Sequence, residues 1–319
     1  MKFRKNLFLA ATMALGIFAS LPAGAAQLGG DARAAIPKDV QQLIVVDYRA
    51  MQNSDAAMNL KARVLPPELK QLETALKSSG LNDNHDIDEL AFAAFRYPGG
   101  GDTTKIVGIA QGQFSLPDIL ANFKKQKLKS TKIRNNFLYP MGQSGMLVSF
   151  LNPTTMVFGS SDSIKYALDA RDGLAPNLLS NDSMMQQMTI VDSEPIWSIL
   201  DQKGTQLMMR GVLGEASQLA DYDTVKKRLT ASRYTMNFNN GVKFNLDVVT
   251  PDTFTAATMS SLLNAAAMYK KVSGTAAEKA AIDNTAIDSN SGTLQVHYSA
   301  SDSQFASLLQ SSLFQSVVH

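Results

Sequence analysis

Hydrophobic and polar residues alternate strictly in several short segments of the chain. The clearest segment is 242–249, in which four apolar residues are separated by Lys243, Asn245 and Asp247. The segment 233–238 alternates in the same way, and Asn239-Asn240-Gly241 between the two is a strong signal for a type I′ hairpin turn. Successive side chains of a strand point to opposite faces, so this hairpin is predicted to have one dry and one wet face, with helices covering only one side of the sheet.

Segments with helical periodicity alternate with strands in the same order in both halves of the chain. The expected elements are a strand at 42–48, a helix at 68–79, a strand at 105–114 and a helix at 119–126 in the first half, then a strand at 195–200, a helix within 213–229, a strand at 242–249 and a helix at 253–272 in the second. With their hairpin partners, these elements predict a β-α-β-β-α-β order for each half, plus an extra hairpin in the first half and a closing helix in both.

A short match in sequence supports an internal duplication. Ser161-Asp162-Ser163 and Ser301-Asp302-Ser303 lie 140 positions apart. Each stands between a strand and a helix, where a side-chain oxygen is needed to cap the free N–H groups of the helix. We therefore expect Asp162 and Asp302 to cap these two helices.

The sequence thus predicts an α+β protein. Its fold is expected to consist of two tandem β-α-β-β-α-β (ferredoxin-like) repeats, with antiparallel sheets and helices on one face. The expected divisions are a signal peptide at 1–25, a first α+β repeat at 26–171, a connector at 172–193 and a second α+β repeat at 194–319.

This arrangement resembles a group of secreted bacterial proteins with tandem α+β repeats. The resemblance lies in Ile36-Pro37-Lys38-Asp39 ahead of an apolar strand, in the crossing from Gly80-Leu81-Asn82 to Asp86-Ile87-Asp88, and in the strand-Ser-Asp-Ser-helix junction. It spans nearly all of the chain after residue 25. The group has no assigned catalytic residues, so the resemblance implies a fold and a location but no activity.

The first 25 residues show the three zones of a secretory signal peptide. Three basic residues within the first five positions precede an apolar run at Leu7–Phe18, and Ala23-Gly24-Ala25 supplies the small residues needed for cleavage. The alternative is an uncleaved anchor helix, but the apolar run is short for a membrane span and Pro22 follows it. A periplasmic or secreted location is expected, with no membrane span in the mature form.

Charge and cysteine content exclude several classes of function. The chain has 30 Lys and Arg against 28 Asp and Glu, and three of the basic groups belong to the predicted signal peptide. The remainder is nearly neutral, so nucleic-acid binding has no compositional support. The absence of cysteine excludes disulfides, thiol catalysis and cysteine-based metal sites.

Histidines and acids provide one candidate for a cation site. His85 lies in the oxygen-rich stretch 82–89, but an EF-hand loop needs glycine where Ile87 stands and an acid where Ala93 stands. An acidic helix-to-strand turn is the favoured interpretation. His297 is expected on the polar face of its strand, and His319 is terminal. No metal site and no cofactor is predicted.

Serine and glycine motifs do not meet a catalytic template. Gly142-Gln143-Ser144-Gly145 lies between two strand patterns and is not a G-x-S-x-G elbow, so it predicts a turn. Gly99-Gly100-Gly101 is followed by a strand and by no Lys-Ser/Thr pair, which favours a hairpin tip over a phosphate loop. No catalytic or cofactor-binding residue is predicted.

Three further features have a structural and a functional interpretation. Basic groups at 124–134, 226–228 and 270–271 are expected to stabilise helix C-termini, the alternative being contact with an anionic envelope surface. Trp197 is predicted to pack in the core or between repeats, with ligand stacking as the alternative. Methionines such as Met184 and Met188 predict adaptable packing, or an apolar groove near the connector.

These observations favour an exported, non-enzymatic envelope protein that acts as an interaction or structural module for an unknown protein or envelope partner. The alternative is a periplasmic carrier of an apolar ligand such as a lipid. Such a ligand would lie between sheet and helices or between the repeats, with the methionine-rich connector as a lid. An enzyme is the third hypothesis, because every catalytic motif fails its template.

Overall fold

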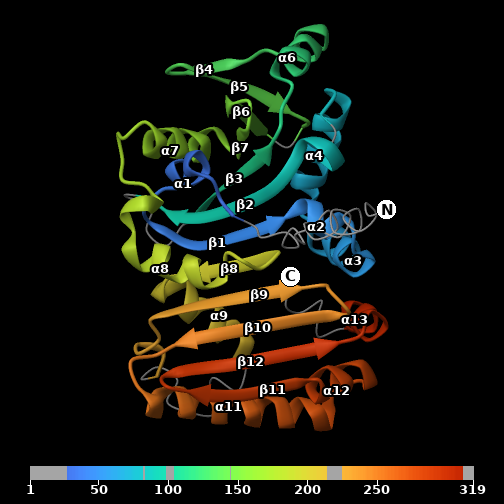
Figure 1. Cartoon of the computed structure of the whole chain (residues 1–319), viewed down its shortest axis with the longest axis vertical. Helices are drawn as coiled ribbons and strands as arrows, with labels where there is room; N and C mark the ends of the chain where they lie inside the picture. Colours follow the sequence, from blue (N-terminus) through green and yellow to red (C-terminus); the bar gives the residue numbers. More distant parts are fainter. Residues whose placement is uncertain (1–26, 82, 98–103, 144, 214–224, 312–319) are drawn as a thin grey trace, which may run out of the picture.

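The computed structural model describes residues 27–81, 83–97, 104–143, 145–213 and 225–311. Within these ranges, twelve strands form one continuous sheet in the order β11-β12-β10-β9-β8-β1-β2-β3-β7-β6-β5-β4 (Figure 1). All neighbouring strands in it are antiparallel. The predicted signal peptide, the Gly99-Gly100-Gly101 tip, Ser144 and His319 lie outside the described residues.

The chain divides at β8 into two parts, which we call the N-terminal half (α1 to α8) and the C-terminal half (β8 to α13). The strands are β1 (Val40–Asp47), β2 (Ile87–Arg96), β3 (Thr104–Gly112), β4 (Thr131–Ile133), β5 (Asn136–Met141), β6 (Met146–Asn152), β7 (Thr155–Gly159), β8 (Ile196–Leu200), β9 (Ala231–Asn237), β10 (Val242–Val249), β11 (Thr285–Asn290) and β12 (Thr293–Ala300).

The helices lie before, between and after these strands. They are α1 (Gly30–Ala34), α2 (Tyr48–Gln52), α3 (Asp55–Val64), α4 (Pro67–Ser78), α5 (Asp83–Asp86), α6 (Leu116–Lys125), α7 (Ser161–Arg171), the 3₁₀ turn η1 (Leu178–Ser180), α8 (Asp182–Val191), α9 (Gln202–Leu213), α11 (Thr253–Ser273), α12 (Ala276–Asp283) and α13 (Asp302–Leu309). Of the helices within the described ranges, none has both the length and the apolar character that crossing a bilayer requires.

The two halves use the same strand order. The order is β1-β2-β3-β7-β6 in the N-terminal half and β8-β9-β10-β12-β11 in the C-terminal half, with β1 and β8 paired at the centre. The fold is α+β as predicted, but the ferredoxin-like arrangement is wrong. A split β-α-β unit inserts another strand between the two strands that its helix connects. Here β1 pairs directly with β2, and β8 with β9. Hydrophobic periodicity shows which face of a strand is buried, but not which strand lies beside it.

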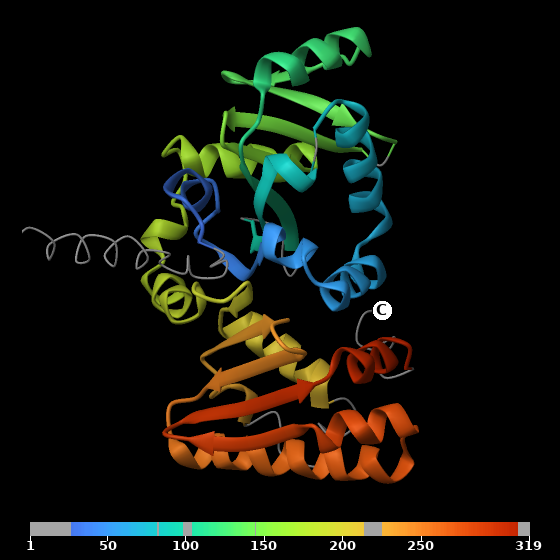
Figure 2. The same cartoon turned by 45° about the vertical axis from the view of Figure 1, so that its right-hand side comes forward.

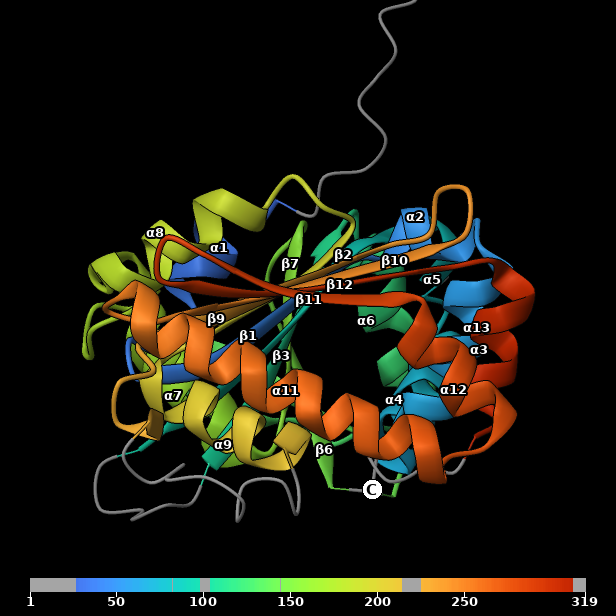
Figure 3. The same cartoon turned by 90° about the horizontal axis from the view of Figure 1, so that it is seen from below.

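Helices cover both faces of the sheet in the N-terminal half, which corrects the prediction of helices on one face. On the first face, α1, α7 and α8 pack on β1–β3 and β7 in a core that contains Leu43, Ile109 and Trp197. On the second face, α4 and α6 pack through Leu72 and Phe123 on residues of β2, β3 and β5–β7. Figure 3 looks along the edge of the sheet, with α1 and α8 on one side and α9 and α11 on the other.

In the C-terminal half beyond β8, the described helices pack on one face of β9–β12, as predicted. Helices α9 and α11 pack through Met209, Met259 and Leu263 on Leu246 and Val248 of β10. Figure 2 shows α11 running along this part of the sheet. The alternation in 242–249 is confirmed, because its apolar residues face this core while Lys243 and Asn245 are exposed.

The predicted connector 172–193 forms η1 and α8 and packs against the N-terminal half. Leu178, Met184, Met188 and Val191 are buried in the core of the first face. The methionines therefore fill a core, and the expected lid over a ligand is not formed by them. The boundaries of the two repeats, 26–171 and 194–319, stay a prediction.

Local signals in the sequence were accurate for one turn and inaccurate for two helix starts. Asn240 and Gly241 have φ of 59° and 97°, the positive values that a type I′ turn requires. The caps of α7 and α13 are Ser160 and Ser301, whose hydroxyls accept hydrogen bonds from the backbone N–H groups of Ser163 and Gln304. The expected caps Asp162 and Asp302 lie instead in the first turns, two residues after the cap of α7 and one residue after the cap of α13.

Two elements of the C-terminal half differ from the sequence prediction. Helix α9 begins directly after β8 and ends at Leu213, whereas the helix was predicted to lie within 213–229. Residues 214–224 lie outside the described residues. Strand β11 was not predicted, although Ser291 and Gly292, with φ of 47° and 83°, form a second turn with two positive φ values before β12.

Candidate functional site

An apolar pocket lies between helices α3 and α4 and the second face of the sheet, and we call it the α3–α4 pocket. Its enclosed volume is about 70 Å³, which is well below the range of sites for drug-sized ligands. It is lined by Tyr48, Lys61, Leu65, Leu69, Leu72, Glu73, Leu76, Lys77, Leu81, Ile87, Leu90, Phe92, Met156 and Phe158. Most of these side chains are aliphatic or aromatic.

The helical wall of the pocket follows from the sequence of α4. Pro67 stands at the first position of the helix, where its missing N–H costs no hydrogen bond. Leu69, Leu72 and Leu76 recur at helical spacing and turn toward the sheet, as predicted for the helix at 68–79. This leucine face meets β2 and β7, and so the pocket is a gap left within the packing of α4 on the sheet.

The floor of the pocket consists of aromatic residues placed around a glycine. Phe92 of β2 and Phe158 of β7 both lie opposite Gly108 of the intervening strand β3. Their rings meet edge to face with centroids 5.9 Å apart. A Cβ atom at Gly108 would overlap the ring of Phe158, so the glycine is what allows the two rings to meet across the middle strand.

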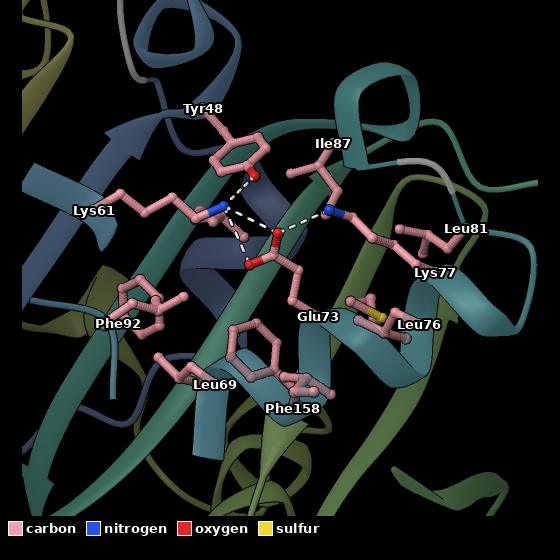
Figure 4. A pocket seen from close by; sticks show the side chains of 14 residues that line it. Tyr48, Lys61, Leu69, Glu73, Leu76, Lys77, Leu81, Ile87, Phe92 and Phe158 are labelled. Atoms are coloured by element: carbon pink, nitrogen blue, oxygen red, sulfur yellow. Dashed lines mark hydrogen bonds and ion pairs between the residues drawn. The ribbon is translucent and has the colours of Figure 1, made fainter. Parts of the chain in front are cut away.

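Charged residues cross the mouth of the pocket, as Figure 4 shows. The Lys61 ammonium lies 2.6 Å from the Tyr48 hydroxyl and 3.2 Å from the Glu73 carboxylate. It also lies 4.8 Å from the centroid of the Tyr48 ring. Glu73 accepts a second ion pair from Lys77 at 2.9 Å. The chain of contacts therefore links α2, α3 and α4 above an apolar floor.

The Lys61 side chain is only 13% exposed, whereas that of Lys77 is 51% exposed. A charged group so far from water is costly unless it is paired. Glu73 and Tyr48 provide the pairing for Lys61. The arrangement holds a paired positive charge at the edge of an apolar cavity.

A second candidate is the face of the C-terminal half that no described helix covers, which we call the open face. Figure 1 shows β9–β12 with no helix in front of them. Its side chains form cross-strand rows: Arg233 lies opposite Asp247, Thr235 opposite Asn245, and Asn245 opposite His297. These are polar residues of both charge signs, and several of them are exposed.

Hydrogen bonds between neighbouring strands order the open face. The Arg233 guanidinium donates to Asp247 at 2.7 Å and to Gln187 of α8 at 2.8 Å. His297 Nδ1 lies 2.8 Å from Asn245 Oδ1, and Asn245 donates to Thr235 at 3.3 Å. The open face is therefore a pre-arranged polar surface, bordered by α8 on one side.

An acidic group with an unusual pKa lies near the start of the described chain. Burial, with Asp47 and Asp88 nearby, raises the pKa of Glu89 from 4.5 to about 7, although the backbone N–H of Gln27 donates to it and acts in the other direction. Asp47 lies directly opposite Glu89 across the β1–β2 ladder. Asp47 also accepts the N-cap hydrogen bond of Ala50 at 2.7 Å.

The structure separates the residues singled out from the sequence. His85 lies in α5, a single helical turn before β2, and His297 lies on the open face as predicted. Within the described ranges, no three or more His, Cys, Asp and Glu side chains are grouped to hold a metal ion. Gly142 and Gly145 have positive φ in the turn between β5 and β6.

The basic groups and Trp197 occupy structural positions. Lys124 and Lys125 lie in the last turn of α6, and Lys270 and Lys271 in the last turn of α11, as predicted. Trp197 is fully buried in the core of the first face, which confirms its predicted packing role.

Sequence reasoning did not find the α3–α4 pocket. The only signal for it was the leucine face of 68–79, because Tyr48, Lys61 and Glu73 follow one another at intervals of 13 and 12 residues and carry no motif. Their meeting depends on the turn between α3 and α4, which the hydrophobic pattern did not reveal.

Comparison with known proteins identifies a fold but no family. No family model matches the chain, and no curated protein sequence matches it significantly. Among solved structures, crystal form I of TP0453, a Treponema protein, is similar with a TM-score of 0.50 and 11% identity, covering 93% of this chain and 100% of that one. Crystal form III of the same protein gives a TM-score of 0.47 at 12% identity, over 87% of this chain and 96% of that one. At this identity, the likeness to form I shows a shared α+β fold alone.

Proposed function

We propose that this chain is an exported protein of the bacterial envelope that acts by binding a partner rather than by catalysis. The observation that carries the proposal is the open face, a polar sheet surface with side chains held in order by cross-strand bonds. Export is supported by the three signal-peptide zones of residues 1–25. The failure of each catalytic motif in the sequence supports a binding role.

The chemistry of the open face favours a folded protein as the partner. Arg233, Asp247, Lys243 and His297 place positive, negative and titratable groups next to amide and hydroxyl side chains. A non-obligate protein interface is about as polar as the rest of a protein surface and has a polar rim, so a face of this composition is compatible with a protein partner. A lipid surface would be matched better by an apolar or uniformly basic face.

Site-specific photo-crosslinking in the producing bacterium tests this role. A photoreactive residue at Thr235, Asn245 or Gln295 should give the same discrete adduct, because these positions lie on one face. Lys70 of α4 and Lys279 of α12, both exposed on helices, provide control positions. The adduct should weaken when Lys243 is changed to Glu on the same face.

Adducts of equal yield at the helical control positions would contradict the proposal, as would their absence from all three open-face positions. An adduct that is unaffected by Lys243→Glu would indicate a contact elsewhere on the molecule. Location is tested separately by N-terminal sequencing of the protein from the periplasmic fraction, where cleavage after Ala25 is expected.

The α3–α4 pocket supports a second candidate function, the carriage of an apolar ligand. Its support is the largely aliphatic and aromatic lining between the helices and the sheet. This function requires that the protein purified from its own periplasm bring a ligand with it. Native mass spectrometry should then show a bound species that organic extraction removes.

A further inference from the structure

Helix α11 has no charged residue on the side that faces away from the sheet, except near its C-terminal end. Met259 and Leu263 turn the other side of the helix toward the sheet. No Asp, Glu, Lys, Arg or His occurs between Thr253 and Tyr269. A helix at a protein surface ordinarily carries charged and polar residues on its outward side. The outward side of α11 is therefore a candidate contact surface.

Large apolar side chains are exposed along this outward side. Phe254 is 77% exposed, Met268 72% and Val272 84%. Consecutive residues of a helix are about 100° apart. This geometry places six residues in one row opposite Leu263, which we call the α11 stripe: Phe254, Thr258, Ser261, Ala265, Met268 and Val272. They follow one another at intervals of 4, 3, 4, 3 and 4 residues, the spacing of helices that pair along a seam.

The α11 stripe is complementary to itself. Its positions form three pairs with equal offsets from position 263, namely 254 with 272, 258 with 268, and 261 with 265. In an antiparallel pair of α11 helices with a two-fold axis at the level of 263, each residue of one copy meets its pair member in the other copy. The outermost layers then contain Phe254 and Val272, whereas the central layers contain only Ser261 and Ala265, which let the helices approach closely. A two-fold dimer requires such a self-complementary surface.

Charge favours a second copy of the chain over a charged partner. An unpaired charge buried against the α11 stripe would be costly, so another uncharged surface matches it best. Antiparallel pairing also places the negative end of each helix dipole beside the positive end of the other. Lys271 flanks the stripe but forms an ion pair with Asp283 of its own chain. The two copies of Lys271 would lie about 24 Å apart along the helix axes, because each is eight residues from the two-fold axis.

The exposed apolar surface is large enough for a weak dimer. Phe254, Met268, Tyr269 and Val272 are each at least 67% exposed. An aromatic side chain alone has about 150–250 Å² of surface, so these four offer on the order of 500 Å² per copy. Two copies would bury on the order of 1,000 Å², the lower end for specific protein interfaces. The expected dissociation constant is therefore in the micromolar range.

We propose that the chain forms a homodimer through antiparallel α11 helices. The proposal goes beyond the binding role of the open face and concerns a different surface, so either can fail while the other stands. Figure 3 shows α11 on the side of the sheet opposite to α1 and α8, and the open face lies on the side of α8. Dimerisation therefore leaves both open faces uncovered and pointing away from each other. Such a dimer offers two binding faces to a partner, which raises avidity.

Sedimentation velocity of the chain without residues 1–25 measures dimerisation. The protein should form a dimer as its concentration rises through the micromolar range. Ala265→Glu places two carboxylates beside the two-fold axis and should weaken the dimer at least about tenfold. Ala121→Glu makes the same change at an exposed position of α6 and should have no effect. Since both alanines are exposed, both variants should keep the circular dichroism spectrum and the melting temperature of the parent protein.

Disulfide formation tests the direction of the pair, because the chain has no cysteine of its own. Phe254→Cys and Val272→Cys proteins should form a disulfide-linked dimer when they are mixed and oxidised. Each variant alone should form almost none, because a residue and its own copy lie about 27 Å apart in the antiparallel pair, far beyond the reach of a disulfide. A parallel pair would give the opposite result.

Four outcomes would overturn the proposal. The first two are a monomer at all concentrations up to about 1 mM and a dimer that Ala265→Glu leaves intact. The third is a disulfide yield in the single variants alone that equals the yield of the mixture. The fourth is a monomer that binds vesicles of phosphatidylethanolamine and phosphatidylglycerol and loses this binding in Ala265→Glu, which would make α11 a membrane contact. Each of these outcomes leaves the crosslinking test of the open face unaffected.

Discussion

The two halves share a strand order, yet the same face of the sheet is a core in one half and a surface in the other. A single row of directly paired residues crosses it: Val157, Ile109, Ala91, Val45, Trp197, Thr235, Asn245, His297 and Ala286. The first five are fully buried, and burial is lost from Thr235 onward. The change occurs between β8 and β9, where α8 ends the helical cover.

The opposite face shows no such change. Its row is Phe158, Gly108, Phe92, Ile44, Ser198, Tyr234, Leu246, Val296 and Ile287. Apolar residues dominate it because helices cover this face in both halves. The comparison shows that one continuous sheet can be covered by helices on both faces in one part and leave a polar face uncovered in another. The difference depends only on which strands are covered by helices on the first face.

The largest effect should come from equivalent truncations within the first row. Ile109→Ala removes a fully buried side chain and should lower the free energy of unfolding by about 2–5 kcal/mol. Asn245→Ala, in the same row but on the open face, should change it by no more than about 0.5 kcal/mol. Urea unfolding measures both. Similar losses in the two variants would mean that the open face is covered by the protein itself.

Gly108 offers a sharper test of the second face. Gly108→Ala should destabilise by about 1–3 kcal/mol through overpacking, because the new methyl group meets the ring of Phe158. Ser299→Ala makes a change of similar size on the open face and should be tolerated. Thermal unfolding compares the pair. An unchanged melting temperature for Gly108→Ala would show that the Phe158 ring can move away from the new methyl group at little cost in free energy.

The titration of Glu89, which lies in the N-terminal half, should make the free energy of unfolding depend on pH. Its pKa of about 7 lies above the ordinary 4.5, so the folded protein binds more protons than the unfolded chain between these values. Stability should therefore fall as pH rises from about 5 to about 7. Since Glu89 is only partly buried, we expect a loss of about 1–2 kcal/mol. Glu89→Gln should remove this part of the slope, and an unchanged slope would place the proton elsewhere.

The smallest effects on the free energy of unfolding should come from the N-caps of α7 and α13. Ser160→Ala and Ser301→Ala each remove a hydroxyl that accepts from the third N–H of a helix, at about 1 kcal/mol each. Asp162→Ala and Asp302→Ala should cost less, because neither residue is the cap. Chemical denaturation of the four variants checks the assignment, and a larger loss in the aspartate variants would reverse it.

The sequence alone determined the features that depend on near neighbours. The alternation in 242–249 specified a two-sided environment, Asn240-Gly241 specified a turn with two positive φ values, and the leucines of 68–79 specified one face of a helix. Each follows from the local geometry of a strand, turn or helix, and each agrees with the structure within a residue or two.

Only the tertiary structure decided which elements lie next to one another. A short apolar strand such as 155–159 has the same hydrophobic pattern whatever its neighbours are. The pattern therefore could not predict the direct β1–β2 and β8–β9 pairings or the central β1–β8 contact. Nor could it predict that helices cover both faces of the N-terminal half. The pocket at Lys61 and Glu73 belongs to the same class. Its residues come from three helices and the sheet, and long-range packing brings them together without any pattern along the chain.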